Sequence, residues 1–324
     1  MRNKVLSVED FFASNSKSLA LVCLNDHRKG QLPITAADIH RPGLALTGFM
    51  ENFLNERIQI LSETEIFYLN SREDRDRRRH VDNLFTAPLV CIIITRDLDV
   101  PSELIDASNE HGVPLFRTSM ITTEFIQELT RFLTDYFAPT EVVHGTMVDV
   151  YGVGLLFTGK SGIGKSEIAL DLIERGHRLV ADDSVIVVKK AEDILLGRGH
   201  EHLQHFMEIR GIGIIDIQAK FGIRAIRVQK RLEVVVNLMQ WDAKKEWERE
   251  GLEQMTTDIL GVKVPKVEVP LFPGKNITVI AEVIAMNHMF KVYGYSAADR
   301  FNKLLIDQME SDRRTRHYLR YDDE

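Results

Sequence analysis

The chain contains little cysteine and no long apolar segment. Its 324 residues include only two cysteines, Cys23 and Cys91, which stand far apart within apolar runs. This argues against a disulfide framework and predicts two buried thiols in a reducing compartment. No run reaches the roughly 20 apolar residues that a membrane-spanning helix requires. Acidic side chains also precede any apolar stretch of signal-peptide length, so we expect a cytoplasmic protein with no membrane partner.

An excess of positive charge is also missing. The 41 Lys and Arg residues are outnumbered by 48 Asp and Glu residues, which gives a formal net charge of −7. Such a balance argues against a nucleic-acid surface. In the run "SREDRDRRRH" at 71–80, acidic residues interrupt the arginines, which favours an exposed helix or loop. No nucleic-acid partner is therefore expected.

Signatures of three other nucleotide-binding classes are absent. The N-K-x-D guanine pattern fails because "NKLL" at 302–305 ends in Leu305. The H-R-D and D-F-G elements of eukaryotic protein kinases do not occur. The fragment "GIGIID" lacks the third glycine of the dinucleotide fingerprint.

Two domains are expected from the pattern of apolar segments. Up to about residue 135, strand-like runs such as "RIQIL" and "PLVCIIIT" alternate with helical patterns such as "TTEFIQELTRFLTDYF", which predicts an α/β domain. "FAPTEVVHG", with Pro139, is typical of a domain boundary. We therefore expect an N-terminal α/β domain over 1–135 and a catalytic domain over 136–324.

The second domain carries a phosphate-loop signature, "GKSGIGKS", at 159–166. A chain of this length matches G-x-x-x-x-G-K-S by chance about one time in a hundred. Here a strand-like run precedes the loop and a helical pattern closed by Gly176 follows it, as nucleotide binding requires. The predicted nucleotide-binding residues are Gly159, Lys160, Ser161, Gly162, Ile163, Gly164, Lys165 and Ser166. Lys165 is expected to reach the β- and γ-phosphates of ATP, and the Ser166 hydroxyl to bind Mg²⁺.

Acidic residues beyond the loop leave alternatives open. Asp182 and Asp183 follow the apolar run "HRLVA", where a carboxylate can manage Mg²⁺ or accept a proton, although two turn-forming residues of a hairpin fit equally well. Glu208, in "EIRGIGIIDI" with Arg210, is either a magnesium ligand or a solvated charge on an edge strand. The histidines of "GHEHLQH" (200, 202 and 205) are better explained by a polar loop than by a metal site.

Two further segments are weak signals by themselves. "PLFPGKN" precedes a predicted helix that Asn276 can cap and that ends near Gly294, and it is a second candidate anion-binding turn. Arg249 lies in the amphipathic segment "WDAKKEWEREG", where an arginine is ordinarily solvated.

Taken together, "VHGTMVDVYGVGLLFTGKSGIGKSE", "ADDSV", "EIRGIGIIDI" and "PGKN" resemble, in this order, the bacterial HPr kinase/phosphorylase family. The resemblance covers 141 to about 305. It implies an enzyme that uses ATP and Mg²⁺ to phosphorylate a serine of HPr, a carrier of the sugar phosphotransferase system. It also implies the reverse reaction, in which inorganic phosphate removes the phosphoryl group and pyrophosphate forms, and a role in carbon catabolite repression.

The resemblance also implies roles for individual residues. The catalytic residues correspond to His144, Lys165, Asp183 and Arg249, with Asp183 as the base and Asp182 in support. The metal ligands correspond to Ser166 and Glu208. The dephosphorylation loop corresponds to Pro270, Leu271, Phe272, Pro273, Gly274 and Lys275. The family usually has P-x-x-P-G-R-N there, so Lys275 keeps the charge of an arginine but loses its bidentate fork.

The same resemblance implies a C-terminal fold related to phosphoenolpyruvate carboxykinase, a homohexamer, and control by a sugar bisphosphate and free phosphate. Two other functions use the same phosphate loop. One is an ATP-dependent kinase of a small metabolite, and the other is a binding protein that senses ATP without transferring phosphate.

Overall fold

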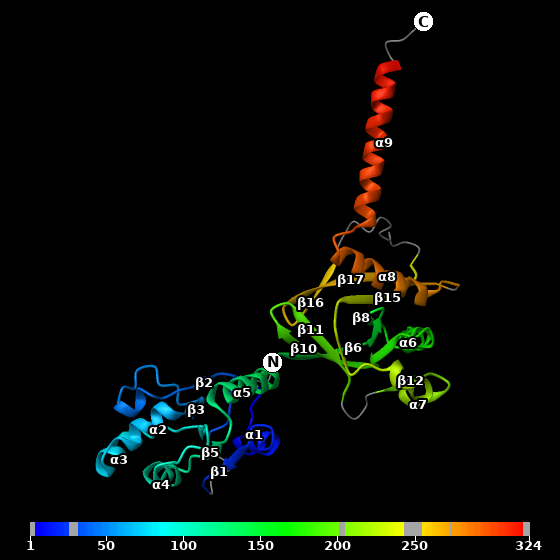
Figure 1. The fold of residues 1–324 in the computed structure, drawn as a ribbon. Coiled ribbons are helices and arrows are strands. Elements are labelled where there is room, and N and C mark those ends of the chain that lie inside the picture. Colours follow the sequence, from blue (N-terminus) through cyan, green and yellow to red (C-terminus); the bar gives the residue numbers. More distant parts are fainter. Residues whose placement is uncertain (1–3, 26–31, 201–204, 243–254, 273, 320–324) are drawn as a thin grey trace. The chain divides into compact units, whose positions relative to one another are not determined.

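A computed structural model describes residues 4–25, 32–200, 205–242, 255–272 and 274–319. The chain divides into two compact units, Met1–Ala138 and Pro139–Glu324, which are described separately (Figure 1).

The first unit is a mixed α/β layer structure. Within its described residues, five strands form a sheet in the order β1-β5-β4-β3-β2, with β1 antiparallel to β5 and the other pairs parallel. The strands are β1 (Leu21–Cys23), β2 (Ile39–His40), β3 (Ile58–Leu61), β4 (Ile92–Ile94) and β5 (Leu115–Thr118). The helices are α1 (Val8–Asn15), η1 (Ala45–Thr47), α2 (Glu63–Asn70), α3 (Asp74–Leu84), α4 (Ser102–Glu110) and α5 (Thr122–Phe137).

Successive side chains along the strands point to opposite faces of the sheet, so this unit has two cores. Ile93 packs in a cluster with residues of α1 and α5, whereas Ile92 and Ile94 pack in a cluster with residues of α2, α3 and α4. The predicted α/β alternation is therefore confirmed, and the charge run lies mostly in helix α3. Cys91 is buried as expected, but Cys23 is only half-buried.

The second unit contains two larger sheets and a hairpin. Within its described residues the strand orders are β16-β17-β15-β8-β7-β9, β14-β11-β10-β6 and β12-β13. The strands of the six-stranded sheet are β7 (Thr146–Val150), β8 (Val153–Gly159), β9 (Arg178–Ala181), β15 (Val234–Gln240), β16 (Thr256–Ile259) and β17 (Val262–Leu271). The others are β6 (Thr140–His144), β10 (Ser184–Ala191), β11 (Ile194–Arg198), β12 (Phe206–Ile209), β13 (Gly213–Asp216) and β14 (Gln229–Arg231).

The carboxyl edge of the six-stranded sheet positions the site. Strands β8, β15 and β17 are parallel neighbours. Their carboxyl ends therefore meet at one edge, which is where ligands bind in open sheets of this kind. The phosphate loop follows β8, and "PLFPGKN" overlaps the end of β17.

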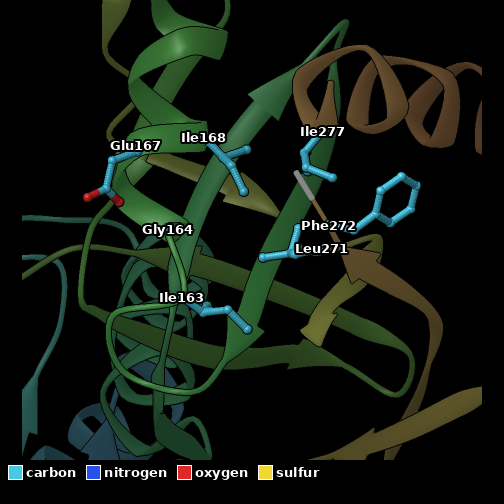
Figure 2. Close-up of a pocket in the computed structure, with 7 residues that line it drawn as sticks. All are labelled: Ile163, Gly164, Glu167, Ile168, Leu271, Phe272 and Ile277. Carbon is cyan, nitrogen blue, oxygen red and sulfur yellow. The ribbon is translucent and has the colours of Figure 1, made fainter. Parts of the chain in front are cut away.

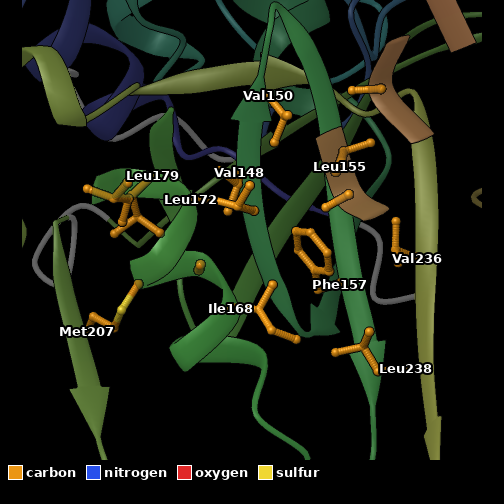
Figure 3. Close-up of a cluster of buried hydrophobic side chains, with 14 of the residues drawn as sticks. Val148, Val150, Leu155, Phe157, Ile168, Leu172, Leu179, Met207, Val236 and Leu238 are labelled. Carbon is orange, nitrogen blue, oxygen red and sulfur yellow. The ribbon is translucent and has the colours of Figure 1, made fainter. Parts of the chain in front are cut away.

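Helices α6 (Lys165–Glu174) and α8 (Ile277–Val292) contribute to the core of the six-stranded sheet, and α7 (Ile217–Phe221), η2 (Ile223–Ala225) and α9 (Ala297–Leu319) complete the unit. Figure 3 shows Ile168 and Leu172 of α6 among Phe157 of β8 and Val148 of β7. As predicted, Asn276 caps α8, because its side chain accepts a hydrogen bond from the Val279 amide. No helix in the described parts of the chain is long and apolar enough to cross a membrane.

The chain passes between the two large sheets at two adjacent points. Gly145 separates β6 from β7, and Asp182 and Asp183 separate β9 from β10. A hydrogen bond of 3.0 Å from the Gly145 amide to the Asp183 carbonyl joins the two crossings. The hairpin alternative for the aspartates is therefore wrong, because β9 pairs with β7 while β10 pairs with β6 and β11.

Candidate functional site

The phosphate loop has the backbone that its glycines permit. Gly159 has φ +142°, and a Cβ atom there would lie 2.6 Å from the Leu238 carbonyl oxygen, so a side chain would displace the neighbouring strand β15. Gly164 has φ +103° and is the N-cap of α6. The unpaired amides and positive dipole end of α6 therefore follow directly from the loop, which forms an anion-binding site.

Lys165 supplies positive charge inside this loop. Its side chain is buried, and its ammonium group lies 3.4 Å from the Gly159 carbonyl and 3.3 Å from the Lys160 carbonyl. These neutral oxygens satisfy the donors without cancelling the charge. The ammonium is thus available to a phosphate that binds against the loop amides.

Asp182 is bound to the same loop. Its carboxylate accepts hydrogen bonds from Thr146 Oγ1 at 2.6 Å and from Ser166 Oγ at 3.0 Å, and also from the Glu208 backbone. Burial raises the pKa of Asp182, although these hydrogen bonds oppose the shift. A hydroxyl and a carboxylate at the end of a phosphate loop are the oxygen donors that Mg²⁺ prefers, so the residues fit this ion.

Asp183 is in a different environment although it is the next residue. Its φ of +61° and a 2.7 Å hydrogen bond from the Ser184 amide to the Asp182 carbonyl form a tight three-residue turn. This turn directs the side chain outward, where 79% of it is exposed and Oδ1 lies 3.2 Å from His144 Nδ1. His144 stands opposite Ser184 in the β6–β10 pairing. The Asp183–His144 pair is therefore accessible to a second protein.

The β12–β13 hairpin brings two charged residues to the site. Glu208 is exposed on β12, and its backbone amide donates a hydrogen bond to the Asp182 carboxylate, which places the Glu208 backbone beside Asp182. The Arg210 guanidinium lies against Gly162 of the phosphate loop, within 2.7 Å of where a Cβ atom would stand, so a side chain at this position would displace it. The sequence pattern marks Arg210 only as a neighbour of Glu208. Its proximity to the loop depends on how the hairpin folds back, which no local pattern indicates.

The end of β17 and the residue after it also reach the phosphate loop. Leu271 and Phe272 line one hollow together with Ile163 and Gly164 (Figure 2). Lys275 Nζ lies 3.3 Å from the Pro270 carbonyl and 5.1 Å from the centre of the Phe272 ring, so its charge is held within its own loop.

Some predicted residues cannot be placed. Arg249, Pro273 and His202 lie outside the described residues. His200 Nε2 lies 3.5 Å from Ser184 Oγ. No group of three or more His, Cys, Asp or Glu side chains among the described residues could hold a metal ion by itself.

Comparisons with known proteins match both halves of the chain. The family described as HPr Serine kinase N terminus matches residues 6–133, and HPr Serine kinase C-terminal domain matches 135–305. An HPr kinase/phosphorylase of Chloroherpeton thalassium is 49% identical over 311 residues, which are 95% of this chain and 92% of that protein. One of Prosthecochloris aestuarii is 48% identical over 302 residues, covering 92% of this chain and 89% of that protein. The solved Hpr(Ser) kinase/phosphatase from Coxiella burnetii is 34% identical, covers 50% of this chain and 98% of its own, and has a TM-score of 0.45.

Proposed function

The chain belongs to the HPr kinase/phosphorylase family, and from this premise we propose that it transfers phosphate from ATP to a serine of HPr and removes it again by phosphorolysis. The observation that carries the proposal is the phosphate loop, with Lys165 buried in it and Ser166 bonded to Asp182 at 3.0 Å. Positioning and charge neutralisation are most of what phosphoryl transfer requires of a protein.

In the kinase direction, the loop amides and Lys165 hold the β- and γ-phosphates of ATP. Bound Mg²⁺ would supply further charge neutralisation, with Ser166 and Glu208 as ligands and Asp182 beside Ser166. Asp183 accepts the proton of the substrate serine as its oxygen attacks the γ-phosphorus. His144, 3.2 Å from the Asp183 carboxylate, orients that carboxylate. Arg249 completes the catalytic set by its position in the family motif, and Arg210 adds a positive charge beside the loop.

In the reverse direction, inorganic phosphate occupies the loop that the nucleotide has left. Its oxygen attacks the phosphorus of phosphoserine, the bond from phosphorus to the serine oxygen breaks, and pyrophosphate forms. Asp183 returns to the serine oxygen the proton that it takes in the kinase direction. The loop 270–275 orients the phosphate in this step.

The family resemblance supports several wider proposals. The second unit is related in fold to phosphoenolpyruvate carboxykinase, and the protein acts as a homohexamer in the cytoplasm. Its reactions control carbon catabolite repression, and a sugar bisphosphate and free phosphate regulate their balance.

The alternative of a small-metabolite kinase is less well supported. The curated relatives are named for HPr, and they match this chain over most of its length. The high exposure of the Asp183 side chain also suits a serine presented by another protein.

The test is to incubate the protein with HPr and ATP labelled in the γ-phosphate, and then to add unlabelled phosphate. We expect label on a serine of HPr, followed by its release as labelled pyrophosphate. Lys165→Ala should slow both directions by roughly a thousandfold or more, because it removes a charge that stabilises the transferring group. Lys220→Ala, an exposed lysine of α7, is the matched control.

Three results would contradict the proposal. Label transferred to a metabolite but not to HPr would favour the alternative kinase. Nucleotide binding without any transfer would favour an ATP sensor. Labelled orthophosphate formed without pyrophosphate would show that the reverse reaction is hydrolysis.

A further inference from the structure

An apolar hollow adjoins the phosphate loop. It has a volume of about 380 Å³ and is lined by Ile163, Gly164, Glu167, Ile168, Leu271, Phe272 and Ile277. This volume lies within the range of roughly 300–1,000 Å³ that is typical of ligand pockets. We call it the apolar hollow.

The lining of the apolar hollow consists mainly of apolar side chains. Five of the seven residues carry apolar side chains, from the phosphate loop, α6, the end of β17 and the start of α8. Figure 2 shows the carboxylate of Glu167 directed away from these apolar side chains. Among the described lining residues, the hollow therefore offers apolar surface to a flat group, and Glu167, the charged member of the lining, points away from it.

Its position restricts what can occupy it. Ile163 and Gly164 belong to the phosphate loop itself, and Glu167 and Ile168 lie in the first turn of α6, so the hollow is continuous with the proposed phosphate site. A ligand held by its phosphates at the loop can extend from there along this first turn into the hollow. Phe272 is 43% exposed, and its ring forms an edge contact with Trp241 at a centroid distance of 5.3 Å. The Lys275 ammonium lies over this ring, and the part of the ring that stays exposed adds aromatic surface to the rim of the hollow.

We propose that the apolar hollow binds the purine base of the nucleotide. The inference rests on the proposed function, since it assumes that a nucleoside triphosphate occupies the loop. Burial of the base accounts for part of the affinity for ATP, while the loop amides and Lys165 bind the phosphates. Because an apolar lining cannot strongly reject a group that differs only at its polar edge, ATP and GTP should bind with affinities within about a hundredfold of each other.

The test compares ATP with inorganic tripolyphosphate, which has the phosphates but no base. Affinities are measured by calorimetry on the full chain with Mg²⁺ and without HPr. We expect the unaltered protein to bind ATP at least tenfold more tightly than tripolyphosphate. Ile277→Ala should weaken ATP binding by about 5- to 20-fold, because it removes apolar area that the base contacts, and should leave tripolyphosphate binding unchanged.

Two further variants sharpen the comparison. Ile277→Trp should fill the hollow and weaken ATP binding more than Ile277→Ala does, whereas retained tripolyphosphate binding shows that the site is still folded. Ile280→Ala is the matched control, because Ile280 lies on the same helix, is half-buried against the same core and does not line the hollow. It should change neither affinity.

The outcomes separate this inference from the proposed function. Equal affinities for ATP and tripolyphosphate would overturn the base site and leave the phosphate site intact, whereas binding of neither would count against nucleotide use altogether. A variant at Ile277 that raises the KM for HPr but leaves ATP affinity unchanged would assign the hollow to the protein substrate. A preference for ATP over GTP beyond a hundredfold would require contacts to the edge of the base and would overturn an apolar site.

Discussion

Two neighbouring carboxylates in this protein have opposite surroundings. Asp182 is enclosed by Thr146 and Ser166, whereas Asp183 is exposed beside His144. The change of direction between them occurs in one tight turn, where Asp183 has φ +61°. Such a backbone is costly for a residue other than glycine, and backbone strain of this kind is concentrated at functional sites. In the proposed mechanism the two side chains therefore have separate roles, with Asp182 beside the proposed metal site and Asp183 facing the substrate.

Asp182 should lower the stability of the protein when Mg²⁺ is absent. A carboxyl group with a raised folded pKa contributes stability that is present below its unfolded pKa, near 3.9, and is lost as pH rises through the folded pKa. The amide of Asp182→Asn carries no charge to desolvate, so the melting temperature of this variant at pH 7 should exceed that of the unaltered protein. The difference should shrink toward pH 4. Thermal unfolding without metal across pH 4–8 measures it.

Asp183→Asn is the control for that prediction and separates the two roles. Because Asp183 is exposed, its amide variant should melt as the unaltered protein does, should bind ATP and should phosphorylate HPr poorly. Asp182→Asn should lose less turnover than Asp183→Asn and should need more Mg²⁺ for its half-maximal rate. If Asp182→Asn loses more turnover than Asp183→Asn at saturating Mg²⁺, the two roles are assigned the wrong way round.

Lys275 should matter more for phosphorolysis than for phosphorylation. In the proposed mechanism the tethered nucleotide positions its own phosphate, whereas free phosphate is positioned by the loop whose Lys275 contacts the Pro270 carbonyl and the Phe272 ring. Lys275→Ala should slow the reverse reaction about tenfold more than the forward one. Rates in both directions are compared with those of Lys263→Ala, an exposed lysine of β17. Equal losses in both directions would remove the special role of this loop.

At the scale of elements, a buried carboxylate fastens α8 to the carboxyl end of α6. Glu282 of α8 accepts two hydrogen bonds from Arg175, at 2.8 and 2.6 Å, and lies 3.1 Å from His177 Nε2. The ring of Tyr151 stands edge-on to His177 at a centroid distance of 4.6 Å. The start of the same helix carries Ile277 at the apolar hollow. Fixing α8 against α6 therefore also fixes one wall of the hollow.

This attachment should make stability depend on acid pH. The hydrogen bonds from Arg175 lower the pKa of Glu282 to about 2, so its contribution is complete above the unfolded pKa, near 4.3, and is lost as pH falls toward 2. At pH 7, Glu282→Gln should reduce the free energy of unfolding by roughly 1.5–3 kcal/mol, as for other hydrogen bonds to charged groups. Denaturant unfolding at pH 7 and pH 3 measures the change. Glu174→Gln, an exposed glutamate of α6, should show no such dependence, and a constant difference at both pH values for Glu282→Gln would contradict the pKa argument.

The sequence predicted individual helices and strands better than it predicted which sheets the strands join and which elements contact each other. Strand β8, the glycine loop and α6 are contiguous, so local pattern was enough to recognise them, and the Asn276 cap of α8 was also local. The move of the chain from one sheet to another at Asp182 was not predicted, because β9 and β10 show the same apolar pattern whichever sheet each joins. The proximity of Arg210 to the phosphate loop was not predicted for a similar reason, since local pattern does not show how the hairpin folds. Its contact with Gly162 joins residues 48 positions apart through a hairpin.

At the scale of the whole molecule, each unit has its own core. The clusters around Phe116 and around Leu69 lie wholly within the first unit, and those around Phe157 and around Val187 lie wholly within the second. The residues proposed for the site that the structure describes, from His144 to Lys275, all lie in the second unit. Each unit therefore has the apolar contacts that independent folding requires.

A fragment of residues 139–324 should consequently fold and act alone. We expect one cooperative thermal transition and rates of both reactions within about tenfold of the full chain, because removal of the first unit takes away no proposed catalytic group. Circular dichroism on heating, together with the labelled-ATP assay, measures both properties. The same fragment with Lys165→Ala is the control, and it should melt normally yet transfer no detectable phosphate. A fragment that melts cooperatively and binds ATP but leaves HPr unphosphorylated would show that the first unit supplies part of the site for the protein substrate. The second unit would then be a nucleotide-binding module, and the role of the first would have to be sought in its own exposed residues.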